Sequence, residues 1–149
     1  FHYRFDQEGS ELTGHAFGNL FITYLDNAKS NIVTLLSIDG GATFGAPILI
    51  YEGETQGRVD VVVLPDGSAL VCWLSGNAEG GAISVRRVQA NGMLGPATVI
   101  AKTDISRSSG FPRMALLGTE VYFAWTEFGQ PSKVRTAIAD VSQYSTRAN

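Results

Sequence analysis

Short apolar runs separated by turn residues follow one another along most of the chain. The runs are rich in β-branched and aromatic residues, and Gly, Asp, Asn and Pro gather between them. Residues 65–68 (Pro-Asp-Gly-Ser) are a strong hairpin signal, because Asp and Gly tolerate the positive φ that such turns require. We predict strands over residues 20–25, 32–36, 47–51, 59–64, 69–74, 82–88, 97–101, 114–117, 121–126 and 134–138. No window of helical length keeps the i, i+3, i+4, i+7 apolar spacing without an interrupting Gly or Pro, so the pattern predicts an all-β chain.

The predicted strands also repeat. Residues 32–50 can be aligned with residues 82–100 at a shift of 50. A second alignment, at a shift of 53 before a hairpin turn and 52 after it, superposes Trp73 on Trp125. A period near 50 residues with four strands per unit is typical of a β-propeller blade.

We therefore expect a partial β-propeller domain over residues 1–149, with three four-stranded blades at about 15–53, 56–103 and 109–141. A blade that is apolar on both faces must stack against neighbours, which explains why alternation is lost in residues 61–64. Propellers typically close with about four to eight blades, so three blades form an open arc. We expect blades outside this chain to complete a ring of six; the alternative is that two or more copies of the chain assemble.

Composition narrows the function classes. The chain has 17 Gly in 149 residues, whereas the average usage of roughly 7% would give about 10. This excess is expected if hairpins recur along the chain. Its 44% hydrophobic and 17% charged residues argue against disorder, and a net charge of −3 does not favour a nucleic-acid partner. No apolar run approaches the roughly 18–20 residues of a membrane span. We expect Cys72, the only cysteine, to be a buried structural thiol, and we expect no metal and no cofactor.

Residues 37–44 contain a sequence motif that indicates a particular kind of turn. Residues 37–44 fit the pattern Ser-x-Asp-x-Gly-x-Thr-(Trp/Phe). The matching residues are Ser37, Asp39, Gly41, Thr43 and Phe44. Asp39 can accept hydrogen bonds from turn amides, and Phe44 can cover the turn, so we interpret the motif as a structural turn rather than a catalytic or metal site. A degenerate copy at residues 89–94 keeps the turn but lacks the Asp and the Thr.

This motif is the Asp box, or bacterial neuraminidase repeat, and the chain resembles the sialidase-like superfamily of Asp-box propellers from about residue 20 to 141. Four further segments look like the later blades of bacterial exo-α-sialidases: residues 57–60, 65–68, 110–113 and 124–127. The resemblance implies an exported bacterial protein that hydrolyses a terminal glycosidic bond in a sialic acid-type glycan. A non-catalytic carbohydrate-binding propeller and a scaffold for protein interactions are the alternatives.

The resemblance also implies site residues. Sialidases bind the substrate carboxylate through arginines and use a tyrosine nucleophile backed by a glutamate, with an aspartic acid as acid/base. Arg58, Asp60 and Arg113 lie at the starts of predicted first strands, and the shift of 53 makes Asp60 and Arg113 equivalent. Tyr144 is the candidate nucleophile and Glu127 a candidate acid at a strand end.

Each candidate has a structural alternative. Arg58 and Asp60 could pair with backbone or with a neighbouring blade, Tyr144 could be a tail residue, and Glu127 only a polar strand end. Arg113 follows a proline in an apolar strand and must find a partner. The Phe/Tyr-Arg-Ile-Pro motif of sialidases is absent, and we expect an early-blade acid to lie outside this chain.

One pair of adjacent basic residues belongs to none of these motifs. Arg86 and Arg87 are adjacent on a predicted strand, and we expect them at a solvated or channel-facing edge.

Overall fold

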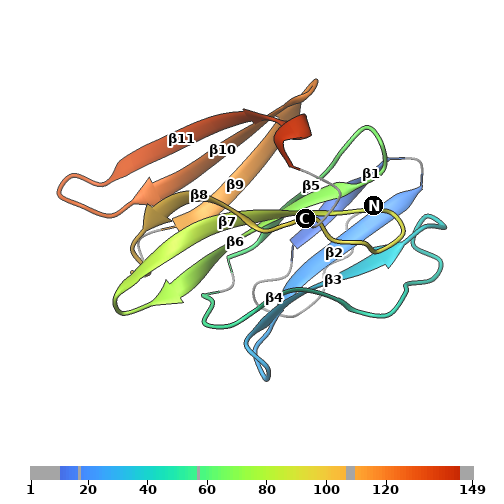
Figure 1. The fold of residues 1–149 in the computed structure, drawn as a ribbon, viewed down its shortest axis with the longest axis horizontal. Coiled ribbons are helices and arrows are strands. Elements are labelled where there is room, and N and C mark those ends of the chain that lie inside the picture. Colours follow the sequence, from blue (N-terminus) through green and yellow to red (C-terminus); the bar gives the residue numbers. More distant parts are fainter. Residues whose placement is uncertain (1–10, 17, 57, 107–109, 145–149) are drawn as a thin grey trace.

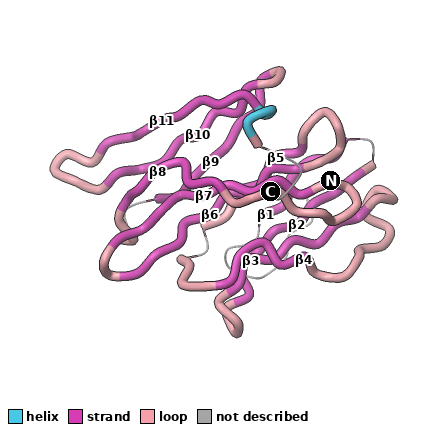
Figure 2. The backbone as a smooth tube through the Cα atoms, viewed as in Figure 1, coloured by secondary structure: helices cyan, strands magenta, loops and turns pink. Residues whose placement is uncertain are grey.

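The computed structural model describes residues 11–16, 18–56, 58–106 and 110–144. This part of the chain is all-β, without an α-helix, and forms three antiparallel sheets (Figure 1). The first sheet contains β1 (Glu11–Ala16), β2 (Asn19–Asp26), β3 (Asn31–Ser37) and β4 (Ile48–Glu52). The second contains β5 (Asp60–Val63), β6 (Ala69–Asn77), β7 (Gly80–Val88) and β8 (Thr98–Thr103). The third contains β9 (Gly110–Leu117), β10 (Glu120–Glu127) and β11 (Lys133–Asp140), and is followed by the 3-10 turn η1 (Val141–Gln143), the cyan segment in Figure 2.

The strand predictions are confirmed, and one strand was missed. Each of the ten predicted runs corresponds to one of β2 to β11. The strand β1 has no counterpart among them, because its sequence, Glu-Leu-Thr-Gly-His-Ala, has no β-branched or aromatic run. It is a strand because it pairs with β2, with Leu12 opposite Ile22.

The sheets follow one another in chain order, with their first strands side by side (Figure 1). β1 contacts β5, and β5 contacts β9. Successive side chains of β6 point to opposite faces. Trp73 packs on the first sheet beside Phe21, whereas Leu74 packs on the third beside Phe123. The middle sheet is therefore covered on both faces.

Because both faces of the middle sheet are covered, residues 61–64 do not alternate between apolar and polar side chains. In β5, Val61 belongs to the cluster with the first sheet, and Val62 packs against the cluster with the third. Cys72 on β6 is fully buried, as predicted.

The register shows which positions repeat. Asp60 lies opposite Cys72, and Arg113 lies opposite Ala124, so Asp60 and Arg113 are structurally equivalent. In the third strands, however, the shift of 50 is wrong by one residue. The register is broken by one extra residue in each fourth strand, Ile50 in β4 opposite Ile32–Val33 and Ile100 in β8 opposite Ile83–Ser84. Ile32 therefore corresponds to Ile83, a shift of 51 in the third strands, whereas the shift of 50 holds in the fourth strands. A slip of one residue would turn every side chain to the opposite face of its sheet.

The expectation of a solvated edge at Arg86 and Arg87 is also wrong, because both side chains link sheets. Arg86 Nη1 donates to the carbonyl of Ile50 in the first sheet at 2.8 Å. Arg87 donates to the carboxylate of Asp66 at 2.6 Å and to the carbonyl of Tyr144, beyond the third sheet, at 3.1 Å. Being consecutive on β7, the two arginines reach in opposite directions.

The Asp box forms the turn between β3 and β4. The Asp39 carboxylate accepts hydrogen bonds from the Thr43 amide at 2.9 Å, the Thr43 hydroxyl at 2.5 Å and the Ser37 hydroxyl at 2.7 Å. The Ser37 oxygen accepts in turn from the Gly41 amide at 2.9 Å. Hydrogen bonds from the Thr43 side chain and amide, then from Ser37, lower the pKa of Asp39 to about 2. Phe44 is 38% exposed and covers the turn only in part.

Replacing Arg87 should destabilise the fold more than replacing an exposed arginine. We expect Arg87→Met to lower the free energy of unfolding by about 1–3 kcal/mol, because it leaves partly buried acceptors without their charged donor. Arg135→Met is the matched control: it breaks a half-exposed pair with Glu127, and such pairs contribute about 0–1 kcal/mol. Urea unfolding of both variants measures the difference, and equal losses would contradict the role given to Arg87.

The Asp box should also give the stability a distinct acid dependence. The pKa of Asp39 is lower in the folded chain than in the unfolded one, so its contribution is present above about pH 4 and is lost as the pH falls toward 2. Between pH 5 and pH 2 the free energy of unfolding should therefore fall more steeply for the native chain than for Asp39→Asn, as measured by urea unfolding at each pH. Parallel curves would show that the turn does not depend on the carboxylate charge.

Candidate functional site

Four of the predicted site residues lie at one end of the sheets. This end carries the β4–β5 loop, the β6–β7 hairpin, the β8–β9 loop and the β10–β11 turn, because β5 and β9 begin there and β6, β8 and β10 end there. Arg58, Asp60, Arg113 and Glu127 belong to these segments. The Asp-box turn and the 65–68 turn lie at the opposite end.

Asp60 and Arg113 are brought together across two sheets. Arg113 Nη1 lies 3.7 Å from Asp60 Oδ1, and the Met114 amide donates to Asp60 Oδ2 at 2.7 Å. The Asp60 side chain is only 13% exposed, whereas that of Arg113 is 63% exposed. Burial raises the pKa of Asp60, while the amides of Met114 and Val61 and the charge of Arg113 act against this rise. The result is a buried carboxyl that holds a solvent-reaching guanidinium.

Arg58 and Phe111 form a second contact between the same two sheets. They occupy equivalent positions at a shift of 53, each just ahead of Asp60 or Arg113, and both have left-handed backbones, with φ of 46° and 51°. The Arg58 guanidinium carbon lies 4.2 Å from the centroid of the Phe111 ring. Such backbone conformations cost about 1–3 kcal/mol each in non-glycine residues and concentrate at functional sites.

The Arg58 guanidinium is fixed by polar contacts as well. Its Nη1 donates to the carbonyl of Ser106 in the β8–β9 loop at 3.1 Å. Burial lowers the pKa of Arg58, and nearby Asp104 acts in the opposite direction. The ring of Phe111 remains accessible, since the residue is 57% exposed. An aromatic ring and a fixed guanidinium thus lie together at this end.

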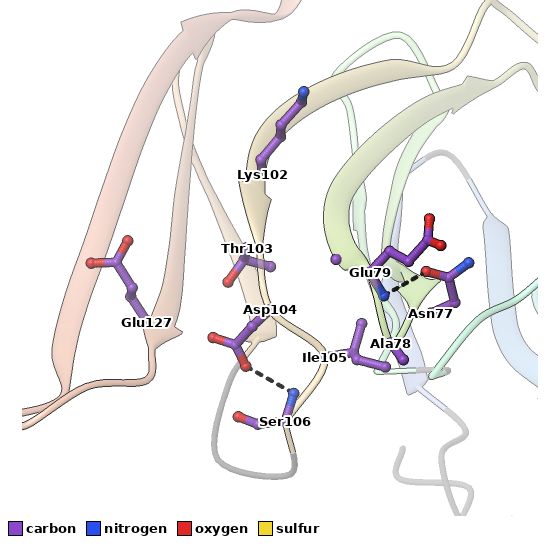
Figure 3. A pocket seen from close by; sticks show the side chains of 10 residues that line it. Asn77, Ala78, Glu79, Lys102, Thr103, Asp104, Ile105, Ser106 and Glu127 are labelled. Atoms are coloured by element: carbon purple, nitrogen blue, oxygen red, sulfur yellow. Dashed lines mark hydrogen bonds between the residues drawn. The ribbon is translucent and has the colours of Figure 1, made fainter.

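A pocket of about 630 Å³ opens beside this cluster, between the β6–β7 hairpin and the β8–β9 loop (Figure 3). Its polar lining residues are Asn77, Glu79, Lys102, Thr103, Asp104, Ser106 and Glu127. Glu127 is engaged, because its Oε2 accepts from Arg135 at 2.7 and 2.9 Å. A neighbouring pocket of about 690 Å³ is lined by Tyr51 and Glu54, among others.

Several of these residues were not found from the sequence. Glu79, Lys102 and Asp104 belong to no motif, and single charged residues near turns are ordinary surface residues. The available signal was their position, since all three lie in or next to segments at the end that carries Arg58 and Arg113.

Tyr144 is not brought together with the arginines. It is 6% exposed and packs edge-to-face on Phe123, with ring centroids 6.3 Å apart. Its carbonyl accepts from Arg87, which also binds the 65–68 turn, so Tyr144 lies at the end of the sheets opposite to Asp60. Burial raises the pKa of its phenol.

Comparisons with known protein families and with curated proteins give no match for this chain. Within the described ranges, no group of three or more His, Cys, Asp or Glu side chains is arranged to hold a metal ion. The same ranges contain no helix long and apolar enough to cross a membrane.

The pairing of Asp60 with Arg113 can be tested by titration. We expect Arg113→Gln to raise the pKa of Asp60 further, because the guanidinium charge is one of the influences that lower it. Carboxyl-carbon NMR of the folded chain follows the Asp60 titration directly. Arg135→Gln, which removes a charge beside Glu127, should leave that titration unchanged. An unaltered Asp60 curve in Arg113→Gln would show that the two groups do not interact in solution.

Proposed function

We propose that the three sheets are successive blades of a sialidase-like β-propeller, and that this chain supplies the arginine side of a site for an acidic sugar. The observation that carries the proposal is that the starts of β5 and β9 place Arg58, Asp60 and Arg113 at one end of adjacent sheets. In the complete protein, exported and bacterial by its family resemblance, the site would hydrolyse a terminal glycosidic bond of a sialic acid-type glycan.

Carboxylate recognition follows from the chemistry of the two arginines. A guanidinium pairs with a carboxylate through two parallel hydrogen bonds, which fix orientation as well as charge. Arg113 reaches solvent and is held from behind by Asp60. Arg58 is already ordered by Phe111 and Ser106, so less conformational entropy would be lost when it binds an anion.

Asp60 is the described group best suited to proton transfer at this end. A carboxyl whose pKa is raised by burial holds a proton at higher pH than an exposed one and can act as a general acid. The nucleophile and an early-blade acid would come from blades outside this chain. Tyr144, buried in the core at the other end, is poorly placed for that task.

A carbohydrate-binding propeller without catalysis is the second candidate. It is favoured by the engagement of Glu127 with Arg135 and by the burial of Tyr144, which leave the described residues with arginines and an exposed aromatic ring but without a clear nucleophile. Binding through Arg58, Phe111 and Arg113 would then be the whole function of the site.

Binding of N-acetylneuraminic acid tests the proposal. We expect Arg113→Gln and Arg58→Gln each to weaken binding about tenfold or more, since a charge-assisted hydrogen bond contributes about 1.5–3 kcal/mol. Phe111→Leu should weaken binding less, because it removes only the ring that orients Arg58. Isothermal titration calorimetry measures each affinity, with Arg135→Gln as the control that should bind like the native chain.

Three results separate the possibilities. Arginine-dependent binding, together with cleavage of a fluorogenic sialoside by the assembled ring, supports the hydrolase. Arginine-dependent binding without cleavage supports the carbohydrate-binding alternative. Absence of binding to both N-acetylneuraminic acid and glucuronic acid would overturn the assignment of this end as an acidic-sugar site.

A further inference from the structure

The buried carboxyl of Asp60 lies beside a guanidinium that reaches solvent. Arg113 Nη1 is 3.7 Å from Asp60 Oδ1, and the Asp60 side chain is 13% exposed, whereas that of Arg113 is 63% exposed. An acidic ligand that reaches Arg113 from solvent therefore brings a second carboxylate to a cation that Asp60 already neutralises. The two carboxylates would compete for the same guanidinium.

The Asp60 carboxyl is held in place by backbone amides. Its Oδ1 accepts a hydrogen bond from the Val61 amide at 3.0 Å, and its Oδ2 accepts one from the Met114 amide at 2.7 Å. Val61 belongs to β5 and Met114 to β9, so the backbones of two sheets hold one carboxyl. Because the carboxyl cannot turn away without losing these bonds, it relieves the repulsion of a second anion most readily by binding a proton.

The ionisation of Asp60 depends on opposing influences, one of which a ligand would change. Burial raises the pKa of Asp60, while the amides of Met114 and Val61 and the charge of Arg113 act against this rise. A ligand carboxylate paired with Arg113 cancels part of the positive charge that favours the ionised form of Asp60. Binding of such a ligand therefore raises the pKa of Asp60 further.

The neighbouring first strands place charged residues at one repeated position. Glu11 on β1 lies opposite Thr23, as Asp60 lies opposite the buried Cys72. Thr23 and Cys72 are equivalent, because each lies two residues before a leucine whose partner precedes the extra residue of a fourth strand. Glu11, Asp60 and Arg113 therefore hold the same register position on the first strands of three successive sheets.

The remaining titratable residues on the strands that contact β5 are placed elsewhere. β5 contacts β1, β2, β6 and β9. His15 of β1 lies opposite Leu20, near the Asp-box end. Tyr24 and Asp26 of β2 lie on the side of the first sheet turned away from the second, because Leu25 between them packs toward the second sheet. The charge closest to Asp60 among the described side chains is thus that of Arg113.

We propose that Asp60 couples the binding of an acidic sugar at Arg113 to the uptake of one proton from solvent. The inference rests on the proposed function for the ligand and adds how the site responds to pH. The coupling is reciprocal, because the ligand raises the proton affinity of Asp60 by the same factor as the proton raises the affinity for the ligand. Binding of the acidic sugar thus protonates the group that the proposed function uses as a general acid.

The direction of the pH dependence follows from the charges. The pKa of Asp60 is higher in the complex than in the unliganded chain, so the complex binds more protons. The affinity for the ligand therefore rises as the pH falls through the pKa of Asp60 in the complex, and it levels off below the pKa in the unliganded chain. At pH 5 and above the ligand stays ionised, since a carboxyl next to an electronegative carbon titrates at about pH 3–4.

Isothermal titration calorimetry of N-acetylneuraminic acid between pH 5 and pH 8 tests the coupling. We expect the native affinity to rise about threefold or more from pH 7 to pH 5, with proton uptake detected by comparing buffers of different ionisation enthalpy. Asp60→Asn should bind independently of pH, and at pH 7 more tightly than the native chain, because its amide is uncharged and can still accept from Met114. Both histidines remain in this variant, so a flat profile assigns the proton to Asp60.

Two controls isolate the charge effect. Glu120→Gln removes an exposed carboxyl at the start of β10, at the opposite end of the sheets, and should keep the native pH profile. The methyl ester of N-acetylneuraminic acid carries no negative charge, so any binding of it to the native chain should not take up a proton. Carboxyl-carbon NMR of the native chain needs no variant, and the pKa of Asp60 should rise when N-acetylneuraminic acid is added.

The outcomes separate this inference from the proposed function. Arginine-dependent binding with a flat native profile, or an Asp60 titration that the ligand does not move, would overturn the inference and leave the proposed function standing. Weaker binding of Asp60→Asn at every pH, with the native slope retained, would also overturn it, because the proton would then belong to another group. No binding by the native chain between pH 5 and pH 8 would overturn both.

Discussion

The structure depends on the fact that a sheet with two apolar faces must be covered on both of them. The middle sheet meets this requirement through β6, whose successive residues pack alternately on the first and the third sheet. This alternation sets the stacking order, and the stacking order places the first strands of neighbouring sheets side by side. The residues at the starts of β5 and β9 are therefore neighbours in space.

The candidate site is the clearest consequence. Arg58 and Phe111 are far apart in the sequence, as are Asp60 and Arg113, yet each pair meets because it occupies one repeat position in adjacent sheets. The repeat thus places side chains of different chemistry side by side at two backbone positions of adjacent sheets. Where one sheet has a cation, the next has an aromatic ring; where one has a carboxyl, the next has a guanidinium.

Strand order and the equivalence of Asp60 and Arg113 could be predicted because hydrophobic runs and repeated positions are visible in the sequence. The ion pair between the two side chains was not predicted. The β-bulges at Ile50 in β4 and Ile100 in β8 could not be predicted, since a single extra residue leaves no compositional trace. The bonds of Arg87 were missed because its partners include the carbonyl of Tyr144, and any residue can supply a carbonyl. Lys102 and Asp104 were missed because no motif surrounds them. Lys102 lies near the end of β8 and Asp104 in the loop after it, and only the structure shows that this loop contacts Arg58 through Ser106.

The two adjacent arginines of β7 also bear on how the molecule comes apart. Arg86 bonds the second sheet to the first, and Arg87 bonds it to the segment that follows the third. The two arginines are adjacent in β7, so both links depend on the same short stretch of backbone. In stacked repeats, cooperativity depends on the strength of the contacts between neighbours relative to the stability of each unit. A local opening of β7 would release both neighbours at once, so the three sheets should melt as one unit and not peel from an end.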